Sequence, residues 1–334
     1  MARQNTSRWG TESRGRRIVA GALIGVATLL AIVAAAVEVH NHLDPPREAL
    51  VAAYERSDTH RALAAFRARQ LDRPLSRAVF LGTHNSYNSQ AYATLVSYWW
   101  PNQKYSITDQ LRMDIRALEL DVHYTWGALR LCHGNASHMI CSPADRPFED
   151  GLREIHDWLA RPENRQEVLL IELEEYLEGH DAEAFGLLRH YLGDWMYHPA
   201  GGCEPPAEWP TLRELTRAGP AVVVTSKRCY GGEWGQWVFH EFDAPGYPRS
   251  EVKNFKGYPD CNFGREFYAT HFVGFGEDSV SYGPFYSGPK ESGVITAPVL
   301  RDLIKCGVNH IALDQVRPDD SRLAAAAEAL NERN

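Results

Sequence analysis

The body of the chain has no excess of basic residues. The 334 residues include 35 Lys and Arg against 43 Asp and Glu, a formal charge of −8. Residues 1–17 contain five arginines and one glutamate, a net charge of +4, so −8 − (+4) leaves −12 on the remainder. An acidic body repels the phosphates of DNA and RNA, and nucleic acid is therefore not expected as a partner.

The chain also has no CxxC pair, although it has six cysteines. They are Cys132, Cys141, Cys203, Cys229, Cys261 and Cys306. Their spacings do not fit a cysteine and histidine zinc site, whereas an even number is typical of disulfides in an oxidising compartment. Among the many connectivities allowed, only Cys132 with Cys141 is close enough in sequence to be predicted.

The sequence has no internal repeat and no low-complexity tail, but residues 18–37 form one long apolar run. Its twenty residues are uncharged and mostly aliphatic or small, and as a helix they would reach ~30 Å, enough to cross a bilayer. No face of the run is polar, which argues against a buried core helix. Arginines before the run and acidic residues after it place the N-terminus in the cytoplasm and the chain from about Glu38 outside.

Two fates of this segment stay open. Residues 34–36 (AAA) would suit a signal peptidase, but the run is longer than the apolar region of most signal peptides, which slightly favours a retained anchor. We therefore expect a membrane-anchored or secreted protein whose catalytic domain is extracytoplasmic and works at a membrane surface.

The rest of the chain divides into a helical linker at 38–75 and one domain at 76–334. Strands are predicted at 78–81, 118–122, 129–131, 168–173, 221–224 and 308–313, and helices at 107–116, 149–159, 181–192 and 321–330. A stretch at about 229–298 is dense in Gly, Pro and aromatic residues and is predicted to be a functional insert with a strand at 267–272. Alternating strands and helices indicate an α/β fold, a (β/α) barrel whose catalytic groups lie at the carboxyl ends of strands.

The strand at 118–122 carries an acidic pair. Alternation along a strand puts Glu119 and Asp121 on one face, where they repel each other unless a cation holds both ionised. A solvated strand edge gives the same pattern. The metal interpretation is favoured by the neighbouring segments 82–87 (GTHNSY) and 131–134 (LCHG), which follow other predicted strands.

Four side chains offer only oxygen ligands, which suit Ca²⁺ first and Mg²⁺ second. They are Asn85, Glu119, Asp121 and Glu174. Glu172 has the same strand parity as Glu174 and stays an alternative, but Glu174 lies nearer the end of its strand.

The remaining polar residues at strand ends suit proton transfer and phosphate binding. His84 and His133 would then act as general base or acid. Asp314 either caps the next turn or accepts a proton from one nitrogen of His84, which would fix the tautomer. Lys227 and Arg228 are candidate substrate-binding residues, with a surface position as the alternative. The combination describes phosphodiester cleavage.

The motifs at 82–87, 118–121 (LELD) and 132–134, in this order and spacing, resemble the catalytic X region of phosphatidylinositol-specific phospholipases C, most of all its bacterial calcium-dependent branch. The resemblance covers about residues 76–176 and implies a distorted (β/α)8 TIM barrel of the phospholipase C-like phosphodiesterase type. It implies that an inositol hydroxyl attacks phosphorus, which yields diacylglycerol and a cyclic inositol phosphate.

The resemblance also assigns roles to residues. It makes Asn85, Glu119, Asp121 and Glu174 the calcium ligands. His84 would stabilise pentavalent phosphorus or act as base, and His133 would protonate the departing glyceride oxygen.

Two other functions stay open. A glycerophosphodiester phosphodiesterase shares the barrel, the acidic pair and the paired histidines, but that family usually has arginine and glycine where this chain has Asn85 and Ser86. The other alternative is a membrane-anchored barrel without catalysis that binds a ligand through its aromatic insert.

Overall fold

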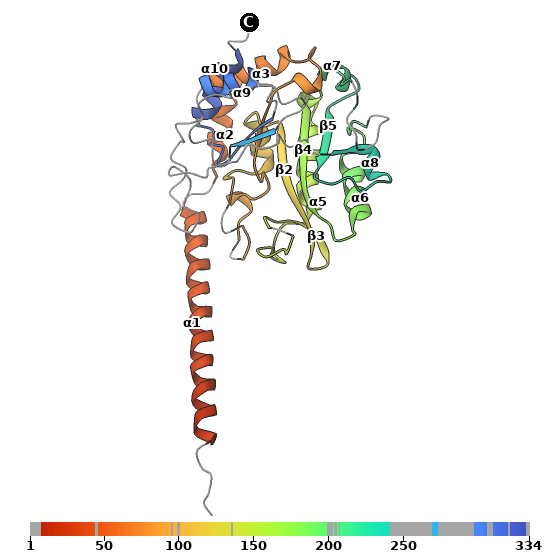
Figure 1. The fold of residues 1–334 in the computed structure, drawn as a ribbon. Coiled ribbons are helices and arrows are strands. Elements are labelled where there is room, and N and C mark those ends of the chain that lie inside the picture. Colours follow the sequence, from red (N-terminus) through yellow and green to blue (C-terminus); the bar gives the residue numbers. More distant parts are fainter. Residues whose placement is uncertain are drawn as a thin grey trace, which may run out of the picture.

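The computed structural model describes most of the chain. The described residues are 8–43, 46–94, 96–98, 101–134, 136–198, 203, 206, 208–240, 269–272, 297–305, 310–319 and 321–331. The first element is a long helix, α1 (Arg8–Leu43), which projects away from the rest of the protein (Figure 1). Within it, Ile18–Ala36 is long and apolar enough to cross a membrane, and none of this stretch is buried. Its length and composition are those of a membrane anchor or of a signal sequence.

Two helices precede the sheet, in the part of the chain predicted to be a helical linker. They are α2 (Glu48–Tyr54) and α3 (Asp58–Arg69). Ser57 begins α3, because its side chain accepts a hydrogen bond from the backbone of His60 at 3.1 Å. The apolar positions Leu63 and Phe66 of α3 are buried, so this helix packs on the domain.

The domain is built on a parallel sheet. Its strands are β1 (Phe80–Thr83), β2 (Ala117–Thr125), β4 (Val168–Tyr176), β5 (Ala221–Ser226), β6 (Val238–His240), β7 (Ala269–Phe272) and β8 (His310–Leu313). Their order is β6-β5-β4-β2-β1-β8-β7, so β1 lies between β2 and β8. Each neighbouring pair is parallel, and the carboxyl ends of all seven strands therefore meet at one edge.

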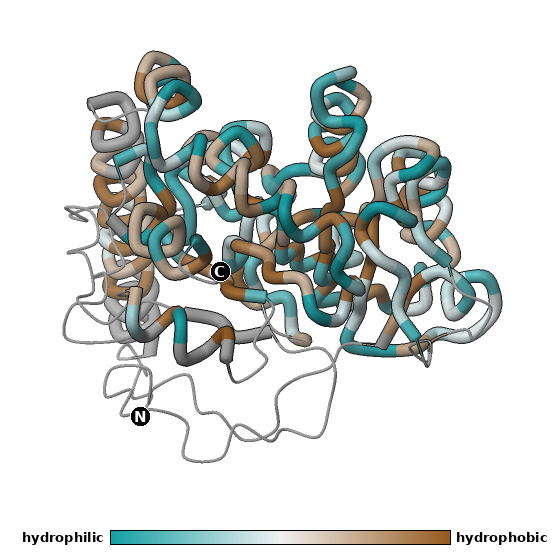
Figure 2. The backbone as a smooth tube through the Cα atoms, turned by 90° about the horizontal axis from the view of Figure 1, so that it is seen from above, coloured by the Kyte–Doolittle hydropathy of each residue, from teal (hydrophilic) through white to brown (hydrophobic). Residues whose placement is uncertain are grey.

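The strands are buried on both faces, as in a barrel covered by helices. Alternate residues such as Phe80, Ala117 and Val223 form a smaller cluster on one face of the sheet. Residues of the other parity, such as Leu118 and Ile171, pack against the helices in the larger core. In Figure 2 the central strands are largely hydrophobic, while hydrophilic positions are common on the surrounding helices.

The covering elements are mostly those that the sequence predicts. The helices are α4 (Ile107–Arg112), α5 (Phe148–Leu159), α6 (Asp181–Leu192), α7 (Leu212–Leu215), α8 (Trp234–Trp237), α9 (Ala297–Lys305) and α10 (Ser321–Asn331), and the 3-10 turns are η1 (Leu75–Arg77), η2 (Gln90–Tyr92) and η3 (Pro162–Asn164). The short helices α7 and α8, strand β6 and helix α9 were not predicted. Strands β6 and β7 both fall within 229–298, so part of the expected insert belongs to the sheet.

One prediction about the strands needs correction. The segment at 129–131 was predicted as a further strand of the alternating series, but β3 (Ala128–Leu131) pairs antiparallel with β2. The two strands form a hairpin closed by Trp126 and Gly127, which have φ values of 54° and 74°. Two successive residues with positive φ define the tight turn that matches strand twist.

Two disulfides are present in the described part of the chain. Cys132 is bonded to Cys141, as predicted, and Cys203 is bonded to Cys229. The other two cysteines, at 261 and 306, lie outside the described residues.

Candidate active site

The site begins at the carboxyl end of β1. His84 follows this strand, and its backbone N–H donates to Leu313 O of β8 at 3.1 Å. Asn85 has a φ of 46°, a conformation that asparagine tolerates better than most residues. Gly82 is required because a Cβ at this position would lie 2.4 Å from Nε2 of His310. Strand β1 thus presents an imidazole and an amide at its end.

His84 is hydrogen-bonded to Asp314, a residue far from it in the sequence. Its Nδ1–H donates to Oδ1 of Asp314 at 2.9 Å, and both residues are buried. Asn102 donates to the same carboxylate oxygen at 3.3 Å. Of the two roles that the sequence left open for Asp314, the structure shows the contact with His84. This contact leaves Nε2 of His84 as the nitrogen that faces the site.

Three carboxylates gather beside His84. Oxygen atoms of Glu119, Asp121 and Glu174 lie within 4.8 Å of one another, because β2 and β4 pair in a register that sets Asp121 opposite Glu174. Glu172 lies one layer deeper, where its carboxylate is 3.4 Å from Nδ1 of His310. Glu174, the residue preferred from the sequence, is therefore the member of the cluster.

Asn85 lies between the carboxylates and the imidazoles. One end of its amide is 2.9 and 3.1 Å from the Asp121 carboxylate oxygens, and the other end is 3.0 Å from His84 Nε2 and from His133 Nδ1. With NH₂ toward Asp121, the amide makes hydrogen bonds on both sides. With oxygen toward Asp121, three oxygen atoms face one another, which only a cation between them makes favourable. The same amide can therefore act as a bridge or as a metal ligand.

His133 reaches the cluster through the β2–β3 hairpin. β2 continues past Asp121, and β3 returns along it with Val122 opposite Leu131. The chain after β3 is therefore led back toward the acidic pair, and Nδ1 of His133 lies 3.4 Å from Oδ2 of Asp121. The His133 side chain is 48% exposed, against 6% for His84.

Burial and charge shift the pKa values in this cluster. Burial, together with repulsion from Glu119 and Glu174, raises the pKa of Asp121 to about 6, although His133 opposes the shift. For His84, burial would lower the pKa, but the negative charges of Asp314 and Glu119 outweigh it and raise the pKa to about 9. The carboxylates therefore leave the cluster short of positive charge.

The two candidate substrate-binding residues after β5, Lys227 and Arg228, differ in their contacts. The Lys227 ammonium contacts the Glu174 carboxylate, and the Lys227 backbone N–H donates to Glu175 Oε2 at 3.1 Å. Arg228 is exposed, and its charge acts on Glu175 and Tyr230. The structure thus brings Lys227 to the cluster and gives Arg228 no contact with it.

A cavity of about 350 Å³ opens beside His133. Its walls include Val96, Met139 and Ile140, which are apolar and exposed. This places an apolar surface next to the candidate general acid.

Three polar residues of the site were missed in the sequence. Tyr176 donates to Glu174 at 2.7 Å, and its strand parity with Glu174 was a usable signal. Asn102 contacts Asp314, and Gln103 donates to the backbone oxygens of His84 and Leu313 at 2.7 and 2.9 Å. Both follow an irregular segment in which the sequence gives no periodic signal.

A barrel with paired imidazoles over an acidic cluster agrees with the comparison to known families. A family model described as the Rv2075c PI-PLC-like domain matches residues 46–320. The chain therefore belongs to this family, and its fold is the TIM-barrel-like fold of phosphatidylinositol-specific phospholipases C.

The chain is also similar in sequence to individual proteins. The chain is 32% identical over 307 residues to the uncharacterized protein Rv2075c of Mycobacterium tuberculosis. This alignment covers 82% of the chain and 61% of that protein. It therefore spans about three fifths of the length of this relative. It is also 29% identical over 196 residues to the PI-PLC X domain-containing protein At5g67130 of Arabidopsis thaliana, covering 55% of this chain and 45% of that protein.

A solved structure shows the same fold. A variant of phosphatidylinositol-specific phospholipase C from Staphylococcus aureus aligns with a TM-score of 0.50 at 13% sequence identity, covering 78% of this chain and 94% of that one. At this identity the similarity concerns the fold.

Proposed function

We propose that this protein is a calcium-dependent phosphodiesterase that cleaves phosphatidylinositol-type lipids into diacylglycerol and a cyclic inositol phosphate. The observation that carries the proposal is a set of potential oxygen ligands for a metal ion beside the imidazoles of His84 and His133. The donors are Asn85, Glu119, Asp121 and Glu174. Membership in the PI-PLC-like family supports the reaction class.

The donor set fits calcium. All four side chains offer oxygen, and the carboxylate oxygens lie within 4.8 Å of one another, while oxygen ligands bind Ca²⁺ at about 2.3 to 2.6 Å. The Asn85 amide can turn its oxygen toward Asp121, which is the orientation that a cation favours. When bound, calcium supplies positive charge for a phosphoryl oxygen.

The chain's own residues would do the rest of the chemistry. A hydroxyl of the inositol ring attacks phosphorus and gives its proton to a base of the cluster, while the bond from phosphorus to the glycerol oxygen breaks. His84, oriented by Asp314, donates from Nε2 to an oxygen on phosphorus. His133 is exposed enough to reach the departing oxygen and donates a proton to it.

The apolar cavity favours a lipid over a soluble diester. Val96, Met139 and Ile140 lie at the side of His133, which is where a departing glycerolipid would lie. Their exposure would be unfavourable in water alone and suits contact with a membrane surface.

An assay panel with the full chain in mixed micelles tests the proposal. Phosphatidylinositol and glycerophosphodiesters are compared with calcium and with excess chelator, and ³¹P NMR identifies the product. We expect a calcium-dependent cyclic inositol phosphate. Equal activity in chelator would refute the metal assignment, preference for glycerophosphodiesters would favour that second function, and inactivity on every diester would favour a binding protein.

A further inference from the structure

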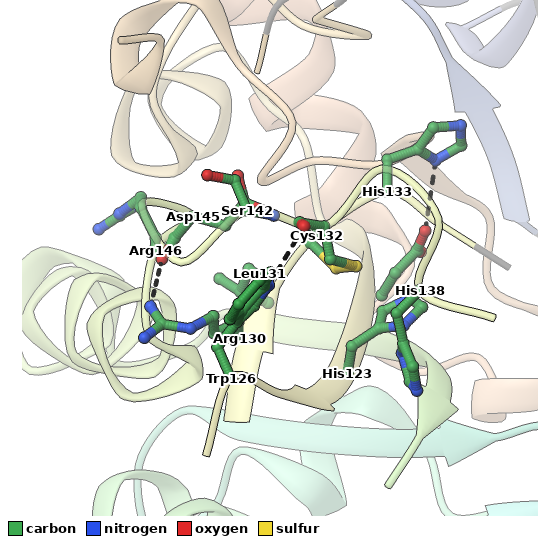
Figure 3. Close-up of a disulfide and its surroundings, with 12 residues drawn as sticks. His123, Trp126, Arg130, Leu131, Cys132, His133, His138, Ser142, Asp145 and Arg146 are labelled. Atoms are coloured by element: carbon green, nitrogen blue, oxygen red, sulfur yellow. Dashed lines mark hydrogen bonds and ion pairs between the residues drawn. A yellow bond between two sulfur atoms is a disulfide. The ribbon is translucent and has the colours of Figure 1, made fainter. Parts of the chain in front are cut away.

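A second cluster of potential ligands lies beside His133 and has no part in the proposed reaction. It consists of the Cys132–Cys141 disulfide and the imidazoles of His123 and His138 (Figure 3). A ring nitrogen of His123 and both sulfur atoms lie within 4.8 Å of one another. The hairpin brings them together, because His123 is on β2 and Cys132 directly follows β3.

The hydrogen bonds fix the tautomer of His123. His138 Nε2 faces the Glu178 carboxylate at 3.5 Å, which favours a proton on that nitrogen. The Nδ1 atoms of His123 and His138 are 2.8 Å apart, so His138 Nδ1 accepts and His123 Nδ1–H donates. Nε2 of His123 is then the nitrogen with a free lone pair.

This lone pair is buried next to the sulfur atoms. His123 is fully buried, and its Nε2 has no hydrogen-bond partner within the described part of the chain. A Cβ added to Gly134 would lie 3.2 Å from Cys141 Sγ and 3.7 Å from His123 Nε2. The sulfur and the nitrogen therefore border the same space.

We propose that reduction of the Cys132–Cys141 disulfide creates a zinc site whose ligands are the two thiolates and His123 Nε2. The cysteine spacing is not that of the common zinc motifs, but the hairpin brings His123 to the two sulfur atoms in space. Sulfur and imidazole nitrogen are the ligands that zinc prefers, and tetrahedral binding at ~2.3 and ~2.0 Å sets them about 3.5 to 3.8 Å apart, with the fourth position open to water. The His123 nitrogen and the sulfur atoms already lie within 4.8 Å of one another, and reduction frees the two sulfur atoms, now bonded to each other, to move apart to this spacing. His138 orients His123 by a hydrogen bond to its other ring nitrogen, and Glu178 contacts His138 in turn. Carboxylates and carbonyls orient the ligating histidines of zinc proteins in the same way.

The step balances with an external dithiol as reductant. The dithiol transfers two electrons to the sulfur–sulfur bond, becomes a disulfide itself and leaves two cysteine thiols. Zinc then displaces one proton from each thiol and takes the His123 lone pair without proton release. The site is separate from the acidic cluster and does not depend on the proposed phosphodiesterase activity.

Alkylation mapping of the full chain in detergent tests the site. The protein is reduced with a phosphine, and each cysteine is alkylated with and without zinc and mapped by mass spectrometry. We expect zinc to slow alkylation of Cys132 and Cys141 at least tenfold and to leave Cys203 and Cys229 unaffected. His123→Gln should abolish the protection. Equal protection in this variant, or none in the wild type, would overturn the proposal.

Cobalt supplies an independent signal, because only thiolate ligands give an intense near-ultraviolet charge-transfer band. The band should appear in reduced protein, disappear in the Cys132→Ser/Cys141→Ser double variant and persist in the Cys203→Ser/Cys229→Ser control. Survival of the band in the first variant would overturn the proposed site.

If His123→Gln does not fold, the zinc affinity of His138→Gln tests the site instead, and we expect a ~10- to 100-fold loss. Unchanged affinity in His138→Gln would also overturn the proposal.

Discussion

The two imidazoles of the site differ in their surroundings, and this difference separates their roles. His84 is buried and fixed by Asp314, whereas His133 is about half exposed and contacts the edge of the acidic cluster. A buried, oriented ring suits binding to a phosphoryl oxygen. An exposed ring suits proton exchange with a leaving group and with solvent.

His133→Ala should retain calcium affinity and lose turnover of natural lipids by about 10²- to 10⁴-fold, the usual contribution of a general acid. A substrate with a nitrophenol leaving group needs no proton and should be cleaved nearly as well as by the wild type. His156→Ala, which removes a half-exposed histidine on α5, is the control. Loss of both activities to the same extent would contradict the acid role.

Lys227 and Arg228 are neighbours in sequence, but only Lys227 contacts the cluster. Lys227→Met should lower kcat/KM by about 10- to 100-fold, as expected for loss of a hydrogen bond to a charged group. Arg228→Met should stay within about twofold of the wild type. Steady-state kinetics on the same micelles make the comparison, and a larger effect of Arg228→Met would restore it as a substrate residue.

Among the elements, β1 lies between β2 and β8 under the site and has little room for a larger side chain at Gly82. Gly82→Ala puts a methyl group 2.4 Å from His310 and 2.9 Å from the Ala117 side chain. We expect a loss of about 1 to 3 kcal/mol in the free energy of unfolding, the usual cost of overpacking.

Gly186→Ala is the matched control for Gly82→Ala. Gly186 lies within α6, and a Cβ there meets nothing within 4 Å, so the change should stabilise the protein by up to about 1 kcal/mol. Urea unfolding followed by circular dichroism measures both variants. Equal effects of the two substitutions would show that the space around Gly82 is not tight.

How far the sequence predicted the elements depends on the signal in each. The pair at Glu119 and Asp121 was found because alternation in a strand is strict, and α5 was found because its apolar residues lie on one side of a helix. Strand β6 has only three residues, too few to show a period. The β2–β3 hairpin was missed because its turn, Trp126 and Gly127, is not one of the pairs most typical of such turns.

The site was predictable where strands carry it. His84, Asn85 and Asp314 follow strands that pair side by side, so strand order alone brings them together. The contacts of Asn102 and Gln103 depend on an irregular segment that packs over the strand ends, and no local pattern encodes that packing.

At the scale of the whole molecule, an ion pair between the buried Arg116 and the partly buried Glu167 couples stability to pH. Arg116 at the start of β2 donates twice to Glu167, at 2.8 and 2.9 Å. Burial would raise the pKa of Glu167, but the Arg116 charge and hydrogen bonds outweigh it and lower the pKa to about 2. A lowered pKa stabilises the fold above the unfolded value of 4.5, and this contribution is lost as pH falls toward 2.

Comparison with Glu167→Gln isolates this contribution. Near pH 7 the wild type should exceed the variant by up to about 3 kcal/mol in the free energy of unfolding. The difference should shrink between pH 4.5 and pH 2, where protonated glutamic acid resembles glutamine. Urea unfolding across this range measures it, and a difference that does not change with pH would contradict the lowered pKa.

The order of the strands also has a consequence for synthesis. His84 is synthesised early and Asp314 late, because they are 230 residues apart in the sequence. The orientation of the His84 ring nevertheless depends on its hydrogen bond to Asp314. A ribosome must therefore release almost the whole domain before a competent centre exists. A nascent or prematurely terminated product would keep His84 without Asp314, so we expect an incomplete chain to lack an ordered site.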